Sequence, residues 1–515
     1  MHMKLIKQHF SVLPETIAAI DLGSNSFHML IAKHENGNLI VIDQLKESVR
    51  LRAGLDEYNN LSDEATQRAL DCLARFGQRI QHFPARGVRI VGTNTLRLAS
   101  NSSELLEKAE ELLGHRIEII SGIEEARLIY IGVAHHVEED NGRRMVIDIG
   151  GGSTEITLGD RFDPVYIKSF EMGSVFFTQR FFEDGKLSKK RLRQAITTAE
   201  LELEPYVEHY KKLNWADVIG ASGTIKSVAN VAFKMGWCND GISAESMNKL
   251  FDEIAQYTHI DDIKLNGLKT ERKPVFAGGF IVLKAIFDTF KIQHMRVSEG
   301  ALREGLLYDL IGREEYEDTR SRTIQSWAKR YNVDRKHAEA VADTALNLFS
   351  QIAKDWKIDD DECQKWLYWS ASIHEIGLII AHNQSHKHGE YIIRNADLAG
   401  FSREDQKVLA TLIRTQRNRF SPDFFNTLDE FVQVKTRKLS MLLRCAVLLN
   451  RSRHYENQII PLISAHDDQV RLVFPENYLE QHPLTSADLY KEQALLEQGG
   501  MKLDITTVAD VNWNL

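Results

Sequence analysis

The sequence predicts an α/β protein of 515 residues in which two similar half-domains are followed by a helical domain and a small α+β domain. Three observations support this fold class. A strand-turn-strand motif occurs twice, short apolar strands alternate with amphipathic helices over the first 310 or so residues, and only helical periodicity follows over the next stretch. One hydrophobic core rarely serves so long a chain, which favours several domains.

The repeated motif reads AAIDLGSNSFHMLIA at residues 18–32 and MVIDIGGGSTEITLG at residues 145–159. Each copy is an apolar strand that ends near an acid, Asp21 or Asp148, followed by a turn of small residues and a second strand. Small residues leave the backbone N–H groups of a turn uncovered, so such a tip can hold a phosphate. Two copies predict two half-domains that face each other across a cleft and share one phosphorylated ligand.

The remaining elements follow in order. Before residue 130 the strand GVRIVGTNTLR and the helix SSELLEKAEELLG complete the first half-domain, and the second copy of the motif opens the next one, which includes a helix over 188–212 and the strand WADVIGASGT. Helices alone then extend to about residue 310. Four domains are predicted, with boundaries at 1–130, 131–314, 315–450 and 451–515.

Composition excludes several classes of protein. Four distant cysteines without a CxxC pair argue against a disulfide framework and a zinc ribbon, and favour a reducing cytoplasm. We find neither a signal-peptide pattern nor an apolar run long enough to span a bilayer. A net charge of −9 argues against a protein that coats nucleic acid.

The positive charge is nevertheless clustered. Between Arg414 and Arg453 there are nine basic residues and only three acidic ones, and GKLSKKRLRQ at 185–194 forms a second basic cluster. Each cluster fits a solvated helix face, but together they also fit a groove that follows a long polyanion. The candidates for this groove are Lys189, Lys190, Arg414, Arg417, Lys435, Arg437 and Lys438.

Three further patterns suggest phosphate chemistry. Glu155 follows Asp148 by seven residues, which places it across the second hairpin, and two carboxylates beside a phosphate loop suit Mg²⁺. In SGIEEARLIY at 121–130, either Glu124 or Glu125 complements the helix dipole while the other reaches the cleft as a general base.

Arg97 ends the predicted strand GTNTLR and either lies on the surface or meets a transferring phosphoryl group. The turn in VIGASGTIKS, at 218–227, could offer N–H groups at a helix N-terminus to another phosphate. Histidines 337, 374, 382, 386 and 388, with Glu375, suggest a metal site, although single histidines are more often packed or exposed.

The motifs AIDLGSNSFHML, GTNTLR, IISGIEEARLIY, VIDIGGGSTE, GASGT and SEGALREG, in this order, closely resemble the exopolyphosphatase and guanosine pentaphosphate phosphatase family. RSRT, HEIGL and NADLAGF extend the resemblance to the long bacterial members. The resemblance implies two ribonuclease-H-like half-domains of the actin, heat-shock chaperone and sugar-kinase type, an all-α HD-like domain and a small α+β C-terminal domain.

The resemblance also implies roles. Glu125 would be the catalytic base, Arg97 would meet the transferred phosphoryl group, and Asp21, Asp148 and Glu155 would organise Mg²⁺ and water. The residues expected to bind phosphate are Ser24, Asn25, Ser26, Gly150, Gly151, Gly152, Ser153, Thr154, Ser222, Gly223 and Thr224.

We therefore expect a Mg²⁺-dependent cytoplasmic exopolyphosphatase, or a guanosine pentaphosphate 5′-phosphohydrolase, or both, as a homodimer without nucleic acid. Peripheral membrane association stays open. A nucleotide-dependent kinase and a non-enzymatic alarmone-binding relative of actin are the alternatives. Glu375 stands where an HD domain has aspartate, so an active second site is not expected there.

Overall fold

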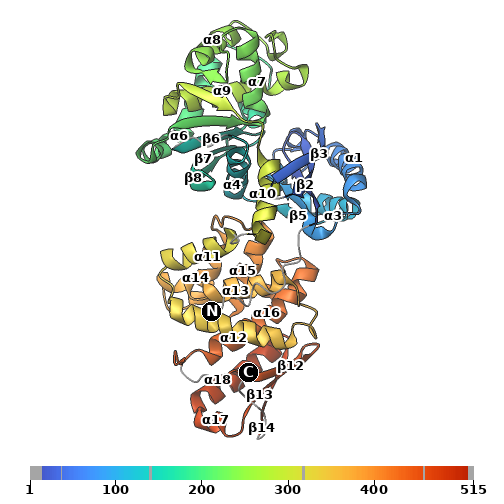
Figure 1. The fold of residues 1–515 in the computed structure, drawn as a ribbon, viewed down its shortest axis with the longest axis vertical. Helices are drawn as coiled ribbons and strands as arrows, with labels where there is room; N and C mark the ends of the chain where they lie inside the picture. The colour runs from blue at the N-terminus through green and yellow to red at the C-terminus, as the bar shows by residue number, and fades with distance from the viewer. Residues whose placement is uncertain (1–13, 36–37, 138–141, 316–318, 456–458, 509–515) are drawn as a thin grey trace. The chain divides into compact units, whose positions relative to one another are not determined.

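A computed structural model describes residues 14–35, 38–137, 142–315, 319–455 and 459–508. The chain forms two compact units, Met1–Glu317 and Asp318–Leu515 (Figure 1). The finer division into four domains stays a prediction. No helix in the described part of the chain is long and apolar enough to cross a membrane.

The first unit begins with a five-stranded sheet whose strands lie in the order β3-β2-β1-β4-β5. The first three strands run antiparallel, while β4 and β5 continue the sheet in parallel with β1. The strands are β1 (Thr16–Leu22), β2 (Phe27–Glu35), β3 (Asn38–Glu47), β4 (Val88–Gly92) and β5 (Ile117–Ile119).

The second sheet repeats this plan as β8-β7-β6-β9-β11, with β10 added at the far edge. Its strands are β6 (Arg143–Ile149), β7 (Thr154–Asp160), β8 (Asp163–Phe170), β9 (Asp217–Ala221), β10 (Ile242–Ser243) and β11 (His294–Val297). Again the first hairpin and its neighbour are antiparallel, and β9 runs parallel to β6. This shared topology confirms the prediction of two similar half-domains.

The pairing of parallel strands places the candidate residues at one edge of each sheet. Asp21 pairs with Val91 of β4, so the residues just after Gly92 lie beside the first hairpin. Asp148 pairs with Ala221, so the chain after β9 begins its helix beside the second acid. The carboxyl ends of parallel strands are where α/β sheets bind ligands.

Local sequence signals explain the helices. In α1 (Asp63–Ile80), Oγ of Ser62 accepts a hydrogen bond from the N–H of Ala65, and acids fill the first turn. Buried Ala65, Ala69, Leu73 and Phe76 return every three or four residues and pack under the first sheet. The other helices of this unit are α2 (Asn94–Leu98), α3 (Ser102–Leu113), α4 (Gly122–Ala134), α5 (Ser174–Phe182), α6 (Lys189–Leu213), α7 (Ser222–Lys234), α8 (Ala244–Ile254), α9 (Lys273–Phe290) and α10 (Leu302–Glu315).

One hydrophobic cluster joins the two half-domains. It combines residues of β1, α4, β6, β9 and α10, among them Ile17, Leu128, Val146 and Leu306, all fully buried. Within the first unit α10 packs against α4 and β1, and Figure 1 shows it passing between the two sheets. The two half-domains are therefore held together by a shared core.

The second unit combines helices with a three-stranded sheet of order β12-β13-β14 around one continuous core. Its helices are α11 (Thr319–Arg330), α12 (Arg335–Ile352), α13 (Asp361–Ser372), α14 (Ser385–Arg394), α15 (Arg403–Thr415), α16 (Glu430–Leu449), α17 (Tyr478–Gln481) and α18 (Pro483–Gln498). Its strands are β12 (Leu462–His466), β13 (Gln469–Pro475) and β14 (Lys502–Val508).

Three local expectations were wrong. β4 ends at Gly92 and Asn94–Leu98 is a short helix, so Arg97 lies on α2 instead of ending a strand. Strands β10 and β11 occur where only helices were expected, because pairing of β11 with β9 and of β10 with β11 outweighs their short local signal. The helical periodicity of ECQKWLYWSASIHEIGLII, at 362–380, predicts a continuous helix, but α13 stops at Ser372, and His374 and Glu375 follow it before a short 3₁₀ turn at Ile376–Ile379.

Candidate active site

The tips of the two hairpins meet. A Cβ built on Gly151 would lie 3.0 Å from Cβ of Ser24, which places the second tip directly against the first. A Cβ on Gly152 would lie only 2.0 Å from Oδ1 of Asn94, so this approach requires glycine. Arg52 Nη1 donates to the same Oδ1 at 3.0 Å and fixes the side chain of Asn94.

Neighbouring segments engage the carbonyl groups of both tips. The N–H groups of Arg52 and Arg50 donate to the carbonyls of Ser24 and Asn25 at 2.9 and 2.8 Å. In the second tip, the N–H groups of Ser174 and Val175 donate to Gly150 and Gly151, both at 2.9 Å. Carbonyl oxygens repel anions, so their engagement within the protein favours tips that present N–H groups to a phosphate.

Four carboxylates share the space beside the tips. Asp148 and Glu155 are direct cross-strand partners in the second hairpin, and the charge of Asp148 also acts on Asp21 of the first. Burial, together with the charge of nearby Glu125, raises the pKa of Asp21 to about 8 and that of Asp148 to about 7. Burial, Glu125 and Asp148 together raise the pKa of Glu155 well above its usual value.

This cluster has the chemistry of a cation site. Oδ1 of Asp21, Oε2 of Glu125 and Oε2 of Glu155 are buried and have no hydrogen-bond partner. Buried carboxylate oxygens are normally paired or bound to a metal. Oxygen donors of this kind fit Mg²⁺, and Asp21, Asp148 and Glu155 do not form one compact group of ligand atoms within 4.8 Å.

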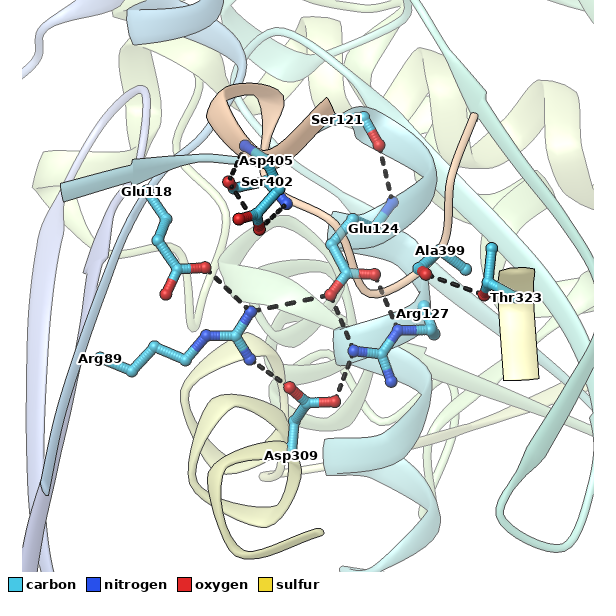
Figure 2. A network of polar contacts seen from close by, with 10 residues as sticks. All are labelled: Arg89, Glu118, Ser121, Glu124, Arg127, Asp309, Thr323, Ala399, Ser402 and Asp405. Atoms are coloured by element: carbon cyan, nitrogen blue, oxygen red, sulfur yellow. Dashed lines mark hydrogen bonds and ion pairs between the residues drawn. The ribbon is translucent and has the colours of Figure 1, made fainter. Parts of the chain in front are cut away.

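The two neighbouring glutamates on α4 have different surroundings (Figure 2). Glu124 is fully buried and accepts two hydrogen bonds of 2.7 Å from Arg127, which also donates to Asp309 of α10 at 2.5 Å. Arg89 of β4 pairs with Asp309, with Glu124 at 3.7 Å and with Glu118 at 3.3 Å. Glu124 therefore belongs to a structural network, while Glu125 influences the cleft acids.

Arg97 contacts Glu125. Its Nη1 donates to the carbonyl of Ile120 at 2.6 Å and lies 3.6 Å from Oε2 of Glu125. Burial raises the pKa of Glu125, and the guanidinium of Arg97 lowers it in opposition. Gly122 lies in the same corner, since a Cβ there would be 2.4 Å from Oγ of Ser169, which donates to Glu155 at 2.8 Å.

Helix α7 starts with a strained residue. Ser222 has φ of 93°, a conformation that non-glycine residues rarely adopt, directly after β9. Such strain is often found at ligand sites. Gly223 follows, and the guanidinium of Arg272 lies against it, 1.8 Å from where a Cβ would be. Thr224 is buried next to them.

The structure adds basic residues that the sequence interpretation missed. Arg303, from the quoted SEGALREG motif, lowers the pKa of Asp21, and its Nη1 lies 3.4 Å from Nδ1 of His28. Lys226, from VIGASGTIKS, lowers the pKa of Asp148. Arg272 and Arg52 come from segments that carried no recognisable signal. These cations can counter the charge of a phosphorylated ligand.

Several other predicted site residues already contact groups within the protein. The hydroxyl of fully buried Thr154 donates to the carbonyl of Met172 and is engaged in the core. In the predicted groove, Arg414 pairs with Glu390, Lys435 with Asp360 and Arg437 with Asp468, and Lys438 donates to the carbonyl of Trp356. Lys189 and Lys190 lie in the first unit and the other candidates in the second. The groove stays a prediction.

The raised pKa of Asp148 predicts a pH-dependent stability. The folded protein keeps this proton above the usual pKa near 4, so it binds more protons than the unfolded chain, and stability falls as pH rises towards about 7. Asp148→Asn does not titrate. In EDTA, its advantage in unfolding free energy over wild type should grow between pH 5 and pH 8 by roughly 1–3 kcal/mol, since one pKa unit is about 1.4 kcal/mol. Denaturant titrations of both proteins at pH 5 and pH 8 measure this change. A difference in unfolding free energy that is the same at both pH values contradicts the prediction.

Paired acidic hairpins, a cluster of acids beside their tips and Arg97 next to Glu125 are typical of a protein of two half-domains that acts on phosphate groups. Comparison with known proteins agrees. The profile of the Ppx/GppA phosphatase family matches residues 30–314, and that of Ppx/GppA phosphatase domain III matches residues 319–493. The chain belongs to the Ppx/GppA phosphatase family.

Curated relatives cover nearly the whole chain. A guanosine-5′-triphosphate,3′-diphosphate pyrophosphatase of Aliivibrio fischeri is 38% identical over 93% of this chain and 95% of its own length. The protein of the same name from Aeromonas hydrophila is 39% identical over 92% of this chain and 95% of its own.

Solved structures match a little over half of the chain. An exopolyphosphatase from Cytophaga hutchinsonii is 25% identical with a TM-score of 0.53, over 58% of this chain and 98% of its own. The family member from Aquifex aeolicus is 23% identical with a TM-score of 0.51, over 59% and 99% of the two chains, and supports the fold.

Proposed function

We propose that this protein hydrolyses the terminal phosphoanhydride bond of guanosine 5′-triphosphate 3′-diphosphate and of inorganic polyphosphate. The observation that carries the proposal is the convergence of both hairpin tips on four buried acids with Glu125 among them. The names of the curated relatives favour the guanosine compound as the better substrate. Polyphosphate presents the same terminal group, and the name of a solved relative supports it.

Glu125 acts as the general base. Its buried carboxylate takes a proton from a water as that water attacks the terminal phosphorus in line with the bridging oxygen that leaves. Burial makes the carboxylate a stronger base by raising its pKa, while the nearby guanidinium of Arg97 acts to lower that pKa. Arg97 also faces the transferred phosphoryl group and counters its negative charge.

The remaining residues hold the substrate. N–H groups at the tips around Ser24–Ser26 and Gly150–Ser153, and at the start of α7, receive the phosphates. Asp21, Asp148 and Glu155 would hold Mg²⁺, which when bound supplies positive charge against the phosphates. The unpaired buried oxygens of Asp21 and Glu155 support this assignment.

The second unit supports the activity of the first. We propose that it keeps an HD-like helical fold, takes part in homodimer formation and contacts a long polyphosphate chain through its basic residues. Polyphosphate binding should then weaken steeply with salt, as contacts to a phosphate backbone do. Binding of the shorter guanosine compound should depend less on salt.

Steady-state phosphate release from both substrates tests the proposal. We expect phosphate release without any acceptor or added nucleotide, and a higher kcat/KM for guanosine pentaphosphate than for polyphosphate. EDTA should lower the rate of release at least about 100-fold, comparable to losing a key charge-stabilising group. A kinase would need an acceptor, and a non-enzymatic alarmone-binding protein would bind without turnover. Release from neither substrate contradicts the proposal.

A further inference from the structure

Two histidines and a glutamate gather inside the second unit. His337 lies in the first turn of α12, and His374 and Glu375 lie just after α13. One ligand atom from each lies within 4.8 Å of the other two. His337 and His374 are 4% and 3% exposed, so both rings are withdrawn from water. Residues far apart in sequence thus place two imidazoles and a carboxylate around one point.

The ring of His374 is oriented for coordination. Its Nδ1 lies 2.7 Å from the carbonyl of Ala371, which can only accept, so Nδ1 carries the hydrogen. A buried unpaired imidazolium is costly, so the ring is neutral and Nε2 holds a free lone pair. That Nε2 is buried and has no hydrogen-bond partner. A ligating histidine is typically held in this way, through a hydrogen bond from its second nitrogen.

His337 and Glu375 complete the group. Nδ1 of His337 lies 3.1 Å from the hydroxyl of Tyr455, and its Nε2 lies 3.9 Å from Oε1 of Glu375. A tyrosine hydroxyl can accept a hydrogen bond, so with the hydrogen on Nδ1 the Nε2 of His337 is free to ligate, as in His374. The two rings lie 5.2 Å apart between centroids.

A cation already contacts the carboxylate. Nη2 of Arg453 donates to Oε1 of Glu375 at 2.6 Å, and its Nη1 donates to Asp334 at 2.8 Å. The side chain of Arg453 is 42% exposed and that of Glu375 is 18% exposed, so the arginine reaches the site from the solvent side. It can move away into water without unpacking the core.

We propose that His337, His374 and Glu375 form a site for a divalent transition metal, with Zn²⁺ as the best match, for which the guanidinium of Arg453 competes. Two imidazole nitrogens and one carboxylate oxygen suit Zn²⁺ and its neighbours in the series, while Mg²⁺ prefers oxygen donors. Three protein ligands leave a coordination position for water. This site is separate in chemistry from the acid cluster of the first unit.

Metal binding to the full-length protein tests the site. After EDTA treatment and dialysis, Co²⁺ is added and its visible absorption is followed, because nitrogen ligands and low coordination number intensify these bands. Wild type should bind one equivalent with this signature, and excess Zn²⁺ should abolish it. In His374→Ala the affinity should fall more than about 100-fold, because even losing an outer partner costs roughly 10- to 100-fold.

Two further variants sharpen the test. Exposed His382→Ala is the matched control and should bind like wild type. Arg453→Gln removes the competing cation and should bind several-fold more tightly, in the opposite direction to His374→Ala. Equal Co²⁺ spectra and stoichiometry in wild type and His374→Ala would overturn the site. Unchanged affinity in Arg453→Gln would overturn the competition.

Discussion

Replacing Glu125 by glutamine is expected to slow phosphate release about 1,000-fold, because a positioned general base contributes roughly 10²–10⁴-fold to such a reaction. Glutamine keeps the shape of the side chain but cannot accept the proton of the attacking water. Substrate affinity should change little, so the loss should appear in kcat more than in KM. The decisive measurement is the steady-state rate on guanosine pentaphosphate with saturating Mg²⁺.

Folding is checked in the same variant. Glu125 raises the pKa of Asp21, Asp148 and Glu155, so removing its charge relieves repulsion among buried acids. The melting temperature of Glu125→Gln in EDTA should therefore equal or exceed that of wild type. Exposed Glu111→Gln is the matched control and should keep wild-type activity. A near-normal rate in Glu125→Gln would remove Glu125 from the role of base.

Arg127→Met is expected to cost about 3–5 kcal/mol of unfolding free energy, the usual cost of breaking a buried ion pair from one side. Glu124 and Asp309 would stay buried with Arg89 as their remaining cationic partner in the network (Figure 2). Helix α4 carries Glu125 next to this network. A small shift there should lower kcat by roughly 10- to 100-fold, since misplacing a catalytic group by about 1 Å has effects of this size.

Hydrogen exchange in peptides of the first unit measures this loss of unfolding free energy. Tryptophan fluorescence is less suitable, because most of the tryptophans belong to the second unit. Exposed Arg86→Met should stay within about 0.5 kcal/mol of wild type, as surface substitutions usually do. The double variant Arg127→Met, Asp309→Asn should lose less unfolding free energy than the sum of the losses in the two single variants, by at least about 0.5 kcal/mol. Strict additivity would show that the network does not act as a unit.

Much of the fold could be predicted because hairpins and helices are local. The duplicated motif required no long-range information, and the N-cap of α1 and the apolar spacing behind it are written in consecutive residues. Strands β10 and β11 escaped prediction because they are short and are stabilised by distant partners, β11 by β9 and β10 by β11. Arg97 was placed on a strand because a run of small polar residues after β4 resembles a strand end.

The candidate site was partly accessible in the same way. Asp21, Asp148 and Glu155 stand out by their repeated or cross-strand position, but nothing in the local pattern of SGIEEA separates Glu124 from Glu125. Their difference depends on Arg89 and Asp309, which are distant in sequence from α4. The cleft cations Arg272 and Arg52 were missed for the same reason, since a solvated and a converging arginine look alike in a linear chain.

Reading along the chain was enough to recognise two equivalent hairpins, the acids that they carry and the family to which the protein belongs, because these properties depend on neighbouring residues and on spacing. Three-dimensional folding was needed to reveal which glutamate is neutralised, which arginines reach the cleft, and that His337 meets His374 and Glu375. Charge, burial and coordination depend on distances through space, and chain order does not encode those distances locally.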